Sequence, residues 1–273
     1  MLKKLFSYVF LLFNVISFII CIISLLLKFT IFDSSFFFSM ANKNNYYQLV
    51  YKNIENDLKN FILSSGFNKK ILLNLYSYDD IKKDVHNYFQ SFYDNQDLKI
   101  ENQTFKDTLI VNINNYISDN NIIINNPKDL AFFVDSIYNI YIENITLNHY
   151  LDSIKKDFML VNDRLFIIIL ISVGMFFITW KKKYLDILFF SSGVLIISFM
   201  YYFLEQVDIN HLFIINEAFS KLIINILFYD IYLLFIIVNV IITLGFLRCI
   251  LEYIFIKKNH CFIKRSFYGR NKY

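Results

Sequence analysis

The residues best suited to catalysis or metal binding are scattered along this sequence. It has four histidines: His86, His149, His211 and His260. No two of them have the short separation that zinc sites use. Asp79, Asp80 and Asp84 come shortly before His86, but they straddle an expected helix start, where the helix dipole stabilises negative charge. We therefore interpret this acidic group as structural and predict no metal site there.

The motifs for calcium, phosphate and nucleophilic chemistry are incomplete. Residues 94–101 resemble the start of a calcium loop, yet Lys99 and Phe105 stand where that loop needs glycine and glutamate. With only 5 glycines in the chain, there is no glycine-rich phosphate loop. Ser64 lacks the strand–turn–helix context of a nucleophile elbow. The sequence thus predicts no catalytic residue and no cofactor.

Five polar residues remain as candidates because they fall inside apolar blocks. They are Asn14, Asp186, Asn239, Arg248 and Glu252. Ionisable groups in membrane spans are functional candidates by default, but the three charged ones lie near expected span ends. Arg248 and Glu252 are four residues apart, which suits an ion pair. The two asparagines can hydrogen-bond between helices. We favour these structural roles over an ion pathway.

The apolar blocks that hold these residues are long enough to cross a membrane. Hydrophobic residues make up 56% of the chain and the mean hydropathy is +0.44. We predict four spans, at residues 5–27, 165–180, 185–204 and 231–256. The second block rises only about 24 Å against a hydrocarbon core of roughly 30 Å, so its flanking basic residues must reach to the interface. The first block is too long for a cleaved signal peptide, so we expect an anchor.

Residues 205–229 pose the main alternative to four spans. Their apolar residues suggest a fifth span, but one stripe is polar: Asn216, Glu217, Ser220, Lys221 and Asn225. This pattern is typical of an amphipathic helix lying at a membrane interface. We therefore predict an external amphipathic segment.

The basic residues predict the orientation. With four spans, Lys3, Lys4, three lysines at 181–183 and six Lys or Arg after residue 256 all lie on one side. Positive charge in short connections marks the cytoplasmic side. Between Asp33 and Arg164, 13 Lys+Arg against 17 Asp+Glu give a balance of −4. Both termini are thus expected in the cytoplasm, and residues 30–163 outside it. Nucleic-acid binding is not expected, since the basic charges flank apolar blocks.

Residues 30–163 have helical periodicity. Apolar residues recur at three- and four-residue steps from Tyr46 to Phe61, before the stop signal Gly66. Ser77 with Asp80 predicts a second helix start, and Thr104 with Asp107 a third. Pro127 after Asn126 predicts a fourth, with a break near Asn148. The Tyr and Phe residues of these stripes are expected in the core.

The predicted fold class is an all-α membrane protein with an extracytoplasmic helical bundle between spans one and two. The organisation is an anchor at 1–29, the helical domain at 30–163, a two-span hairpin at 164–204, the amphipathic segment at 205–229, span four at 230–256 and a basic cytoplasmic tail at 257–273.

Three short stretches resemble a known group of proteins. They are Asn45-Tyr46-Tyr47, Leu63-Ser64-Ser65-Gly66-Phe67 and Phe133-Val134-Asp135. The chain resembles uncharacterised multi-span membrane proteins of low-GC Gram-positive bacteria that carry an extracellular helical domain after the first span. This resemblance implies an architecture and brings no activity.

Three functions fit these features. The one we favour is a non-catalytic binding, sensing or assembly component that acts through its external domain. Its partners would be the lipid bilayer and a membrane or envelope protein or further copies of the chain. An oligomeric transporter or channel subunit is an alternative, although the expected spans lack proline and visible repeats. A membrane-bound enzyme is the other alternative, for which a clustered external acid/His site would be the distinguishing feature.

Overall fold

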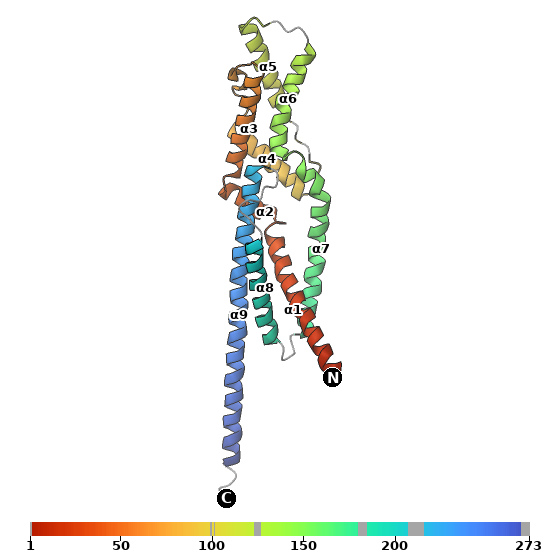
Figure 1. Cartoon of the computed structure of the whole chain (residues 1–273), viewed down its shortest axis with the longest axis vertical. Helices are drawn as coiled ribbons and strands as arrows, with labels where there is room; N and C mark the ends of the chain where they lie inside the picture. Colours follow the sequence, from red (N-terminus) through yellow and green to blue (C-terminus); the bar gives the residue numbers. More distant parts are fainter. Residues whose placement is uncertain are drawn as a thin grey trace. The chain divides into compact units, whose positions relative to one another are not determined.

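The described chain is helical throughout its regular structure. A computed structural model describes residues 2–98, 100, 102–122, 127–179, 185–206 and 216–268. Every regular element in those ranges is an α-helix or a short 3-10 helix (Figure 1). The all-α prediction is therefore confirmed. The described residues fall into two compact units, which we call the apolar unit and the helical domain.

The apolar unit takes the chain up to Lys28, from Asp163 to the end of α8, and from Leu227 onward. Its helices are α1 (Leu2–Phe29), the later part of α7 (Tyr150–Thr179), α8 (Leu185–Gln206) and most of α9 (Glu217–Tyr268). Three helical stretches contain a segment long and apolar enough to cross a membrane: Tyr8–Phe29, Lys128–Met175 and Glu217–Leu251. The last two begin in the helical domain and continue into the apolar unit. The apolar section described in α8, Leu188–Tyr202, is shorter.

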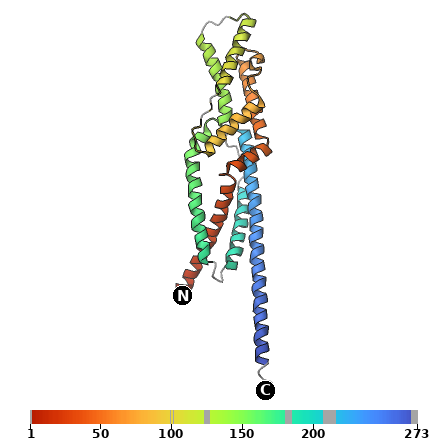
Figure 2. The same ribbon diagram turned by 180° about the vertical axis from the view of Figure 1, so that it is seen from behind.

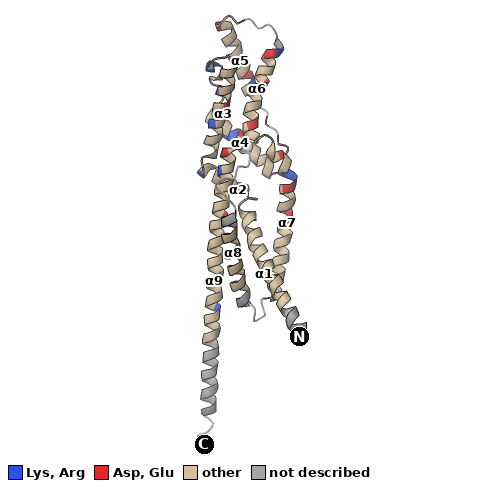
Figure 3. Cartoon of the chain, viewed as in Figure 1, with Lys and Arg blue, Asp and Glu red and all other residues tan. Residues whose placement is uncertain are grey.

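Side-chain exposure in the apolar unit suits a lipid environment. A small core of Ile22, Ile196, Val238 and Ile241 joins α1, α8 and α9. Outside this core, many large apolar side chains are exposed; Phe13 is 64% and Leu251 is 63% exposed. Many exposed large apolar side chains on the same helices are typical of a membrane or partner interface. Figure 3 agrees, since the ribbons of α1 and α8 are mostly tan, the colour of uncharged residues, where they are described.

One long helix covers the predicted fourth span and residues 217–229 of the predicted amphipathic segment. Of the rest of that segment, residues 205–206 end α8 and residues 207–215 lie outside the described residues. Asn216 caps α9, because its side-chain oxygen accepts a hydrogen bond from the Phe219 amide at 2.8 Å. Lys221 pairs with Glu217 one turn later, and the helix then runs without a break to Tyr268. The polar stripe therefore begins the same helix that becomes apolar further on.

The helical domain takes residues from Phe29 to Asn162 and the start of α9 up to Ile226. Its elements are α2 (Ser34–Lys43), α3 (Tyr46–Ser64), η1 (Lys69–Leu72), α4 (Tyr78–Tyr93), α5 (Gln103–Asp119), α6 (Pro127–Thr146) and the first turns of α7. The helix α3 packs on α6 and α4, and α5 packs on η1 and α6 (Figures 1 and 2).

The predicted stripes form the core of this domain. Val50, Ile54 and Leu58 of α3 are buried, and Ile137 and Tyr141 of α6 are fully enclosed. The assignment of the aromatic stripe to the core is confirmed, since the largest fully buried side chains include Tyr46, Tyr88, Tyr141 and Phe105.

Two helix starts show how local signals succeed and fail. The predicted cap at Ser77 is confirmed, with a full capping box to Asp80. The prediction for Thr104 is wrong. The cap is Asn102, whose side-chain oxygen accepts from the Phe105 amide at 3.0 Å. The helix begins after Asn102 because asparagine is at least as good an N-cap residue as threonine. In addition, the side-chain amide of Asn102 donates to Asp84 at 2.9 Å, which fixes the cap in place.

Asparagine takes the left-handed positions that glycine usually fills. Asn45, Asn74, Asn95, Asn121 and Asn148 all have φ between 51° and 57°. Asn95 and Asn121 follow α4 and α5, where 6→1 hydrogen bonds run from Gln96 to Ser91 and from Ile122 to Ile117. These are Schellman ends, in which asparagine is the usual substitute for glycine.

The predicted break near Asn148 is confirmed. Leu147, Asn148 and His149 have φ values of 53°, 53° and 59°, which separate α6 from α7. Leu147 is fully buried, so its burial holds a leucine in a backbone conformation that costs about 1–2 kcal/mol.

Aromatic rings join four helices in the domain. Phe37 of α2 lies 4.6 Å from Phe89 of α4 between ring centroids, and Phe89 is stacked 6.2 Å from Phe219 of α9. Phe92 of α4 lies 4.7 Å from Phe158 of α7. The helix α4 thus binds the starts of α7 and α9 into the domain core.

Candidate functional site

The helical domain has a polar groove of about 500 Å³. It lies between the η1 region and the C-terminal half of α5. Four asparagines line it: Asn68, Asn112, Asn115 and Asn120. Lys70, Leu73, Tyr116 and Asp119 complete the lining. We call this feature the asparagine groove.

The wall on the η1 side is fixed by asparagine side chains. Asn68 caps η1, since its side-chain oxygen accepts from the Lys70 amide at 3.1 Å. Asn112 of α5 donates to the carbonyls of Ile71 at 3.0 Å and Leu73 at 2.8 Å. The fully buried Ile71 anchors η1 in the core beneath. Because these bonds tie the short 3-10 turn to α5, the groove does not depend on a flexible loop.

The α5 side of the groove is fixed by the end of that helix. Asn120 is the C-cap and donates its side-chain amide to the Tyr116 carbonyl at 2.7 Å. The Tyr116 ring lies 5.7 Å from Phe67, which stacks on Phe133 at 4.5 Å. These rings hold Tyr116 at the groove from behind.

The polar groups of Asn115, Lys70 and Asp119 are available to a ligand. Within the ranges described, none of these three side chains forms a hydrogen bond or an ion pair with the protein. Asn115 is exposed on α5. The groove therefore offers an amide, an ammonium and a carboxylate that can turn towards a ligand, on a backbone that the bonds of Asn112 and Asn120 hold in place.

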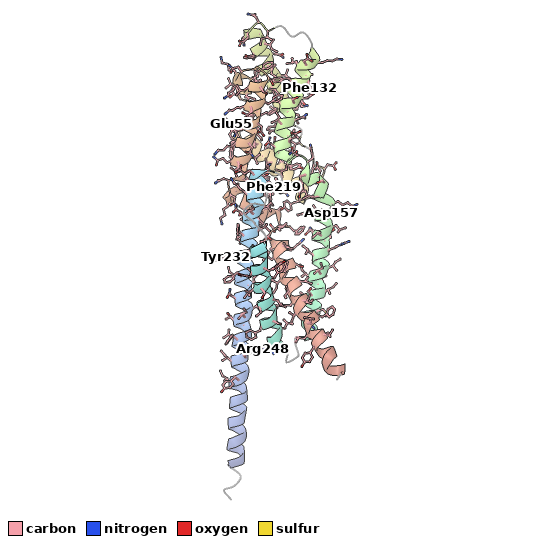
Figure 4. All side chains as sticks on the ribbon, viewed as in Figure 1. Glu55, Phe132, Asp157, Phe219, Tyr232 and Arg248 are labelled. Atoms are coloured by element: carbon pink, nitrogen blue, oxygen red, sulfur yellow. The ribbon has the colours of Figure 1, made fainter. Side chains whose placement is uncertain are left out.

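A second, smaller cavity of about 310 Å³ lies between α5 and α6 and is apolar. Its lining includes Ile110, Ile113, Leu130 and Val134, together with Lys106 and Asp135, which pair with each other at 3.3 Å. Phe132 of α6, labelled in Figure 4, is 75% exposed. Because the two charged groups of this cavity already satisfy each other, it offers a ligand fewer polar groups than the asparagine groove does.

A hydrogen-bond network joins α4, α5 and α6. Asp84 accepts from the Tyr141 hydroxyl at 2.6 Å and from the Asn102 amide at 2.9 Å. Burial, followed by the bond to Asp84, raises the pKa of Tyr141 above its ordinary value. The network is satisfied internally, which is typical of a structural role.

The acidic group near His86 has structural contacts, as its position at a helix start suggests. Asp80 belongs to the capping box, and the His86 ring lies 4.0 Å from that of Phe38. Across the described residues, no set of three His, Cys, Asp or Glu is placed to hold a metal ion.

The five candidates from the apolar blocks are spread over α1, α8 and α9. Asn14 is buried, and its amide donates to the Phe10 carbonyl of the same helix at 2.7 Å. Asn239 is exposed and likewise donates to Phe235 at 2.8 Å. Both amide groups thus bond within their own helices. Arg248 is half-buried on α9. The side chains of Asp186 and Glu252 lie outside the described residues.

The asparagine groove was not predicted from the sequence. The available signal was the density of polar residues at the end of α5, where Asn112, Asn114, Asn115, Asp119 and Asn120 follow closely. A comparison with known proteins adds no assignment, since no family model, curated protein or solved structure matches the chain.

Proposed function

We propose that this chain is a multi-pass protein of the cell membrane, with four spans, both termini in the cytoplasm and residues 30–163 outside. Three apolar helix stretches of spanning length and the bare apolar side chains on them support a place in the membrane. The fourth span would be α8, whose 22 residues rise about 33 Å. The basic residues at both ends of the chain and at 181–183 support the orientation.

In that setting, the chain acts as a non-catalytic binding component through its helical domain. The observation that carries this proposal is the asparagine groove, a cavity of about 500 Å³ with a fixed frame and available polar groups. Its volume lies in the range of about 300–1,000 Å³ that is usual for ligand sites. Sensing or assembly would follow from occupation of this groove.

Site-specific photo-crosslinking tests the binding role. A benzophenone amino acid replaces Leu73 in the groove lining or, as the control, Asp79, which is exposed on α4. After irradiation of native membranes, we expect an adduct from position 73 and none from position 79. Equal adducts from both positions, or none from 73, would contradict a ligand site in the groove.

Cysteine labelling tests the orientation. In a variant with all three native cysteines replaced by alanine, Ser64→Cys or Lys257→Cys supplies the single thiol. An impermeant maleimide added to intact cells should label position 64 and spare position 257 until the cells are lysed. The reverse pattern would overturn the topology.

A further inference from the structure

We propose that the ligand of the asparagine groove is a neutral carbohydrate, bound through its hydroxyl groups. This inference rests on the proposed binding function and names its ligand class. It depends on three features of the lining: the hydrogen-bonding capacity left on the amides, the balance of charge, and one aromatic ring.

The groove amides present donors and acceptors together. Asn112 and Asn120 use their NH₂ groups on backbone carbonyls, so their side-chain oxygens remain as acceptors. Asn68 uses its oxygen on the Lys70 amide, so its NH₂ group remains as a donor. Asn115 has both groups available. A hydroxyl donates one hydrogen bond and accepts two, so a ligand with several hydroxyls can satisfy this mixed set.

The charges in the groove argue against ligands that carry only positive or only negative charge. Lys70 and Asp119 are its only formal charges in the described lining, and they have opposite signs. A phosphate or polycarboxylate site would gather positive groups, and a cation site would gather acidic oxygens. With a balance of zero, neither kind of ion gains net attraction, whereas both side chains can still hydrogen-bond to hydroxyls.

The aromatic ring supplies an apolar contact of the right kind. Tyr116 lines the groove beside Leu73 and is half-buried. The face of an aromatic ring carries partial negative charge, which attracts the C–H groups on the face of a pyranose. Since the ring is held by Phe67, it can receive a sugar face without first being ordered.

The test is a binding titration on the full chain in lipid nanodiscs, because sugar-based detergents would compete. The probes are the neutral trisaccharides maltotriose, cellotriose and chitotriose, with glycylglycine as a zwitterion and inorganic phosphate as an anion. Saturation-transfer NMR reports contact, and calorimetry gives the affinity. At least one trisaccharide should bind, and neither charged probe should.

A matched pair of variants ties any binding to the groove. Asn115→Leu removes an available amide from the lining, whereas Asn114→Leu changes its exposed neighbour on α5, which is outside the lining. Asn115→Leu should weaken trisaccharide binding at least tenfold, and Asn114→Leu should leave it within twofold. Equal effects of the two variants would overturn the proposal.

The outcomes separate the ligand from the function. If position 73 crosslinks in membranes but glycylglycine or phosphate binds in place of the sugars, the carbohydrate inference is overturned and the binding role stands. If no trisaccharide binds and position 73 gives no adduct, both proposals fall.

Discussion

The hydroxyl of Tyr141 donates a 2.6 Å hydrogen bond to the carboxylate of Asp84, across 57 residues of sequence. Tyr141 is fully buried on α6 and Asp84 lies on α4, so this one bond fixes the spacing of two helices. The same carboxylate receives the Asn102 amide, which caps α5. Three helices therefore share a single charged acceptor.

Removing the Tyr141 hydroxyl should destabilise the helical domain. Tyr141→Phe leaves Asp84 with one fewer donor in a partly buried place, so we expect a loss of about 1–3 kcal/mol in the free energy of unfolding. Pulse proteolysis of the full chain across a urea series measures it. The control is Tyr78→Phe, whose side chain is 40% exposed and which should unfold at the wild-type urea concentration. Equal urea midpoints for both variants would show that the Asp84 network does not stabilise the domain.

A charge in the α6 stripe should unfold the domain. Val134 is 7% exposed on α6, whereas Phe132 on the same helix is 75% exposed. Val134→Asp buries a carboxylate without a partner, which costs several kcal/mol, so limited proteolysis should cut the domain rapidly. Phe132→Asp should keep native protease resistance. Resistance in the Val134 variant would show that our core assignment is wrong.

A larger side chain should destabilise the apolar unit at one glycine and leave its stability unchanged at another. A Cβ at Gly193 of α8 would lie 2.9 Å from Cγ1 of Ile242 in α9, while one at Gly174 of α7 would meet no atom within 4 Å. Gly193→Leu should therefore force α8 and α9 apart and cost about 1–3 kcal/mol. Its midpoint of thermal aggregation in detergent should fall below that of wild type. Gly174→Leu should not lower it, and a drop in both would point to a general intolerance of bulk.

Alkaline pH should unfold the helical domain through its buried tyrosines. Burial, and then the nearby Tyr78, raise the pKa of Tyr47 from its ordinary 10 to about 12. Between these values the unfolded chain loses a proton that the folded domain keeps. Stability is thus intact below pH 10 and falls as the pH rises towards 12. Burial also raises the pKa of Tyr46, Tyr88 and Tyr93.

The alkaline transition is measured by tyrosinate absorbance together with far-ultraviolet circular dichroism. We expect tyrosinate to appear late and in step with loss of helix. In Tyr47→Phe the fall in stability between pH 10 and 12 should be shallower. Tyrosinate that appears near pH 10 with helix retained would contradict the burial of these rings.

Elements with local signals were predictable from the sequence. Ser77 with Asp80, the Pro127 start and the break near Asn148 each depend on hydrogen bonds or backbone preferences within a few residues. The helix α2 was missed because its residues 34–43 follow directly on an apolar block and carry several phenylalanines. Its cap, Asp33, accepts a hydrogen bond from the Phe36 amide and is itself a local signal.

By itself, the sequence determined the helical class, the apolar blocks and the core stripes, because hydrophobic periodicity depends on neighbours along one helix. Only the tertiary structure decided that η1 meets α5. The bonds from Asn112 to Ile71 and Leu73 join residues 41 and 39 positions apart, and periodicity contains no information about such pairs. The groove exists because those distant backbones pack together, and their polar groups then face one shared space.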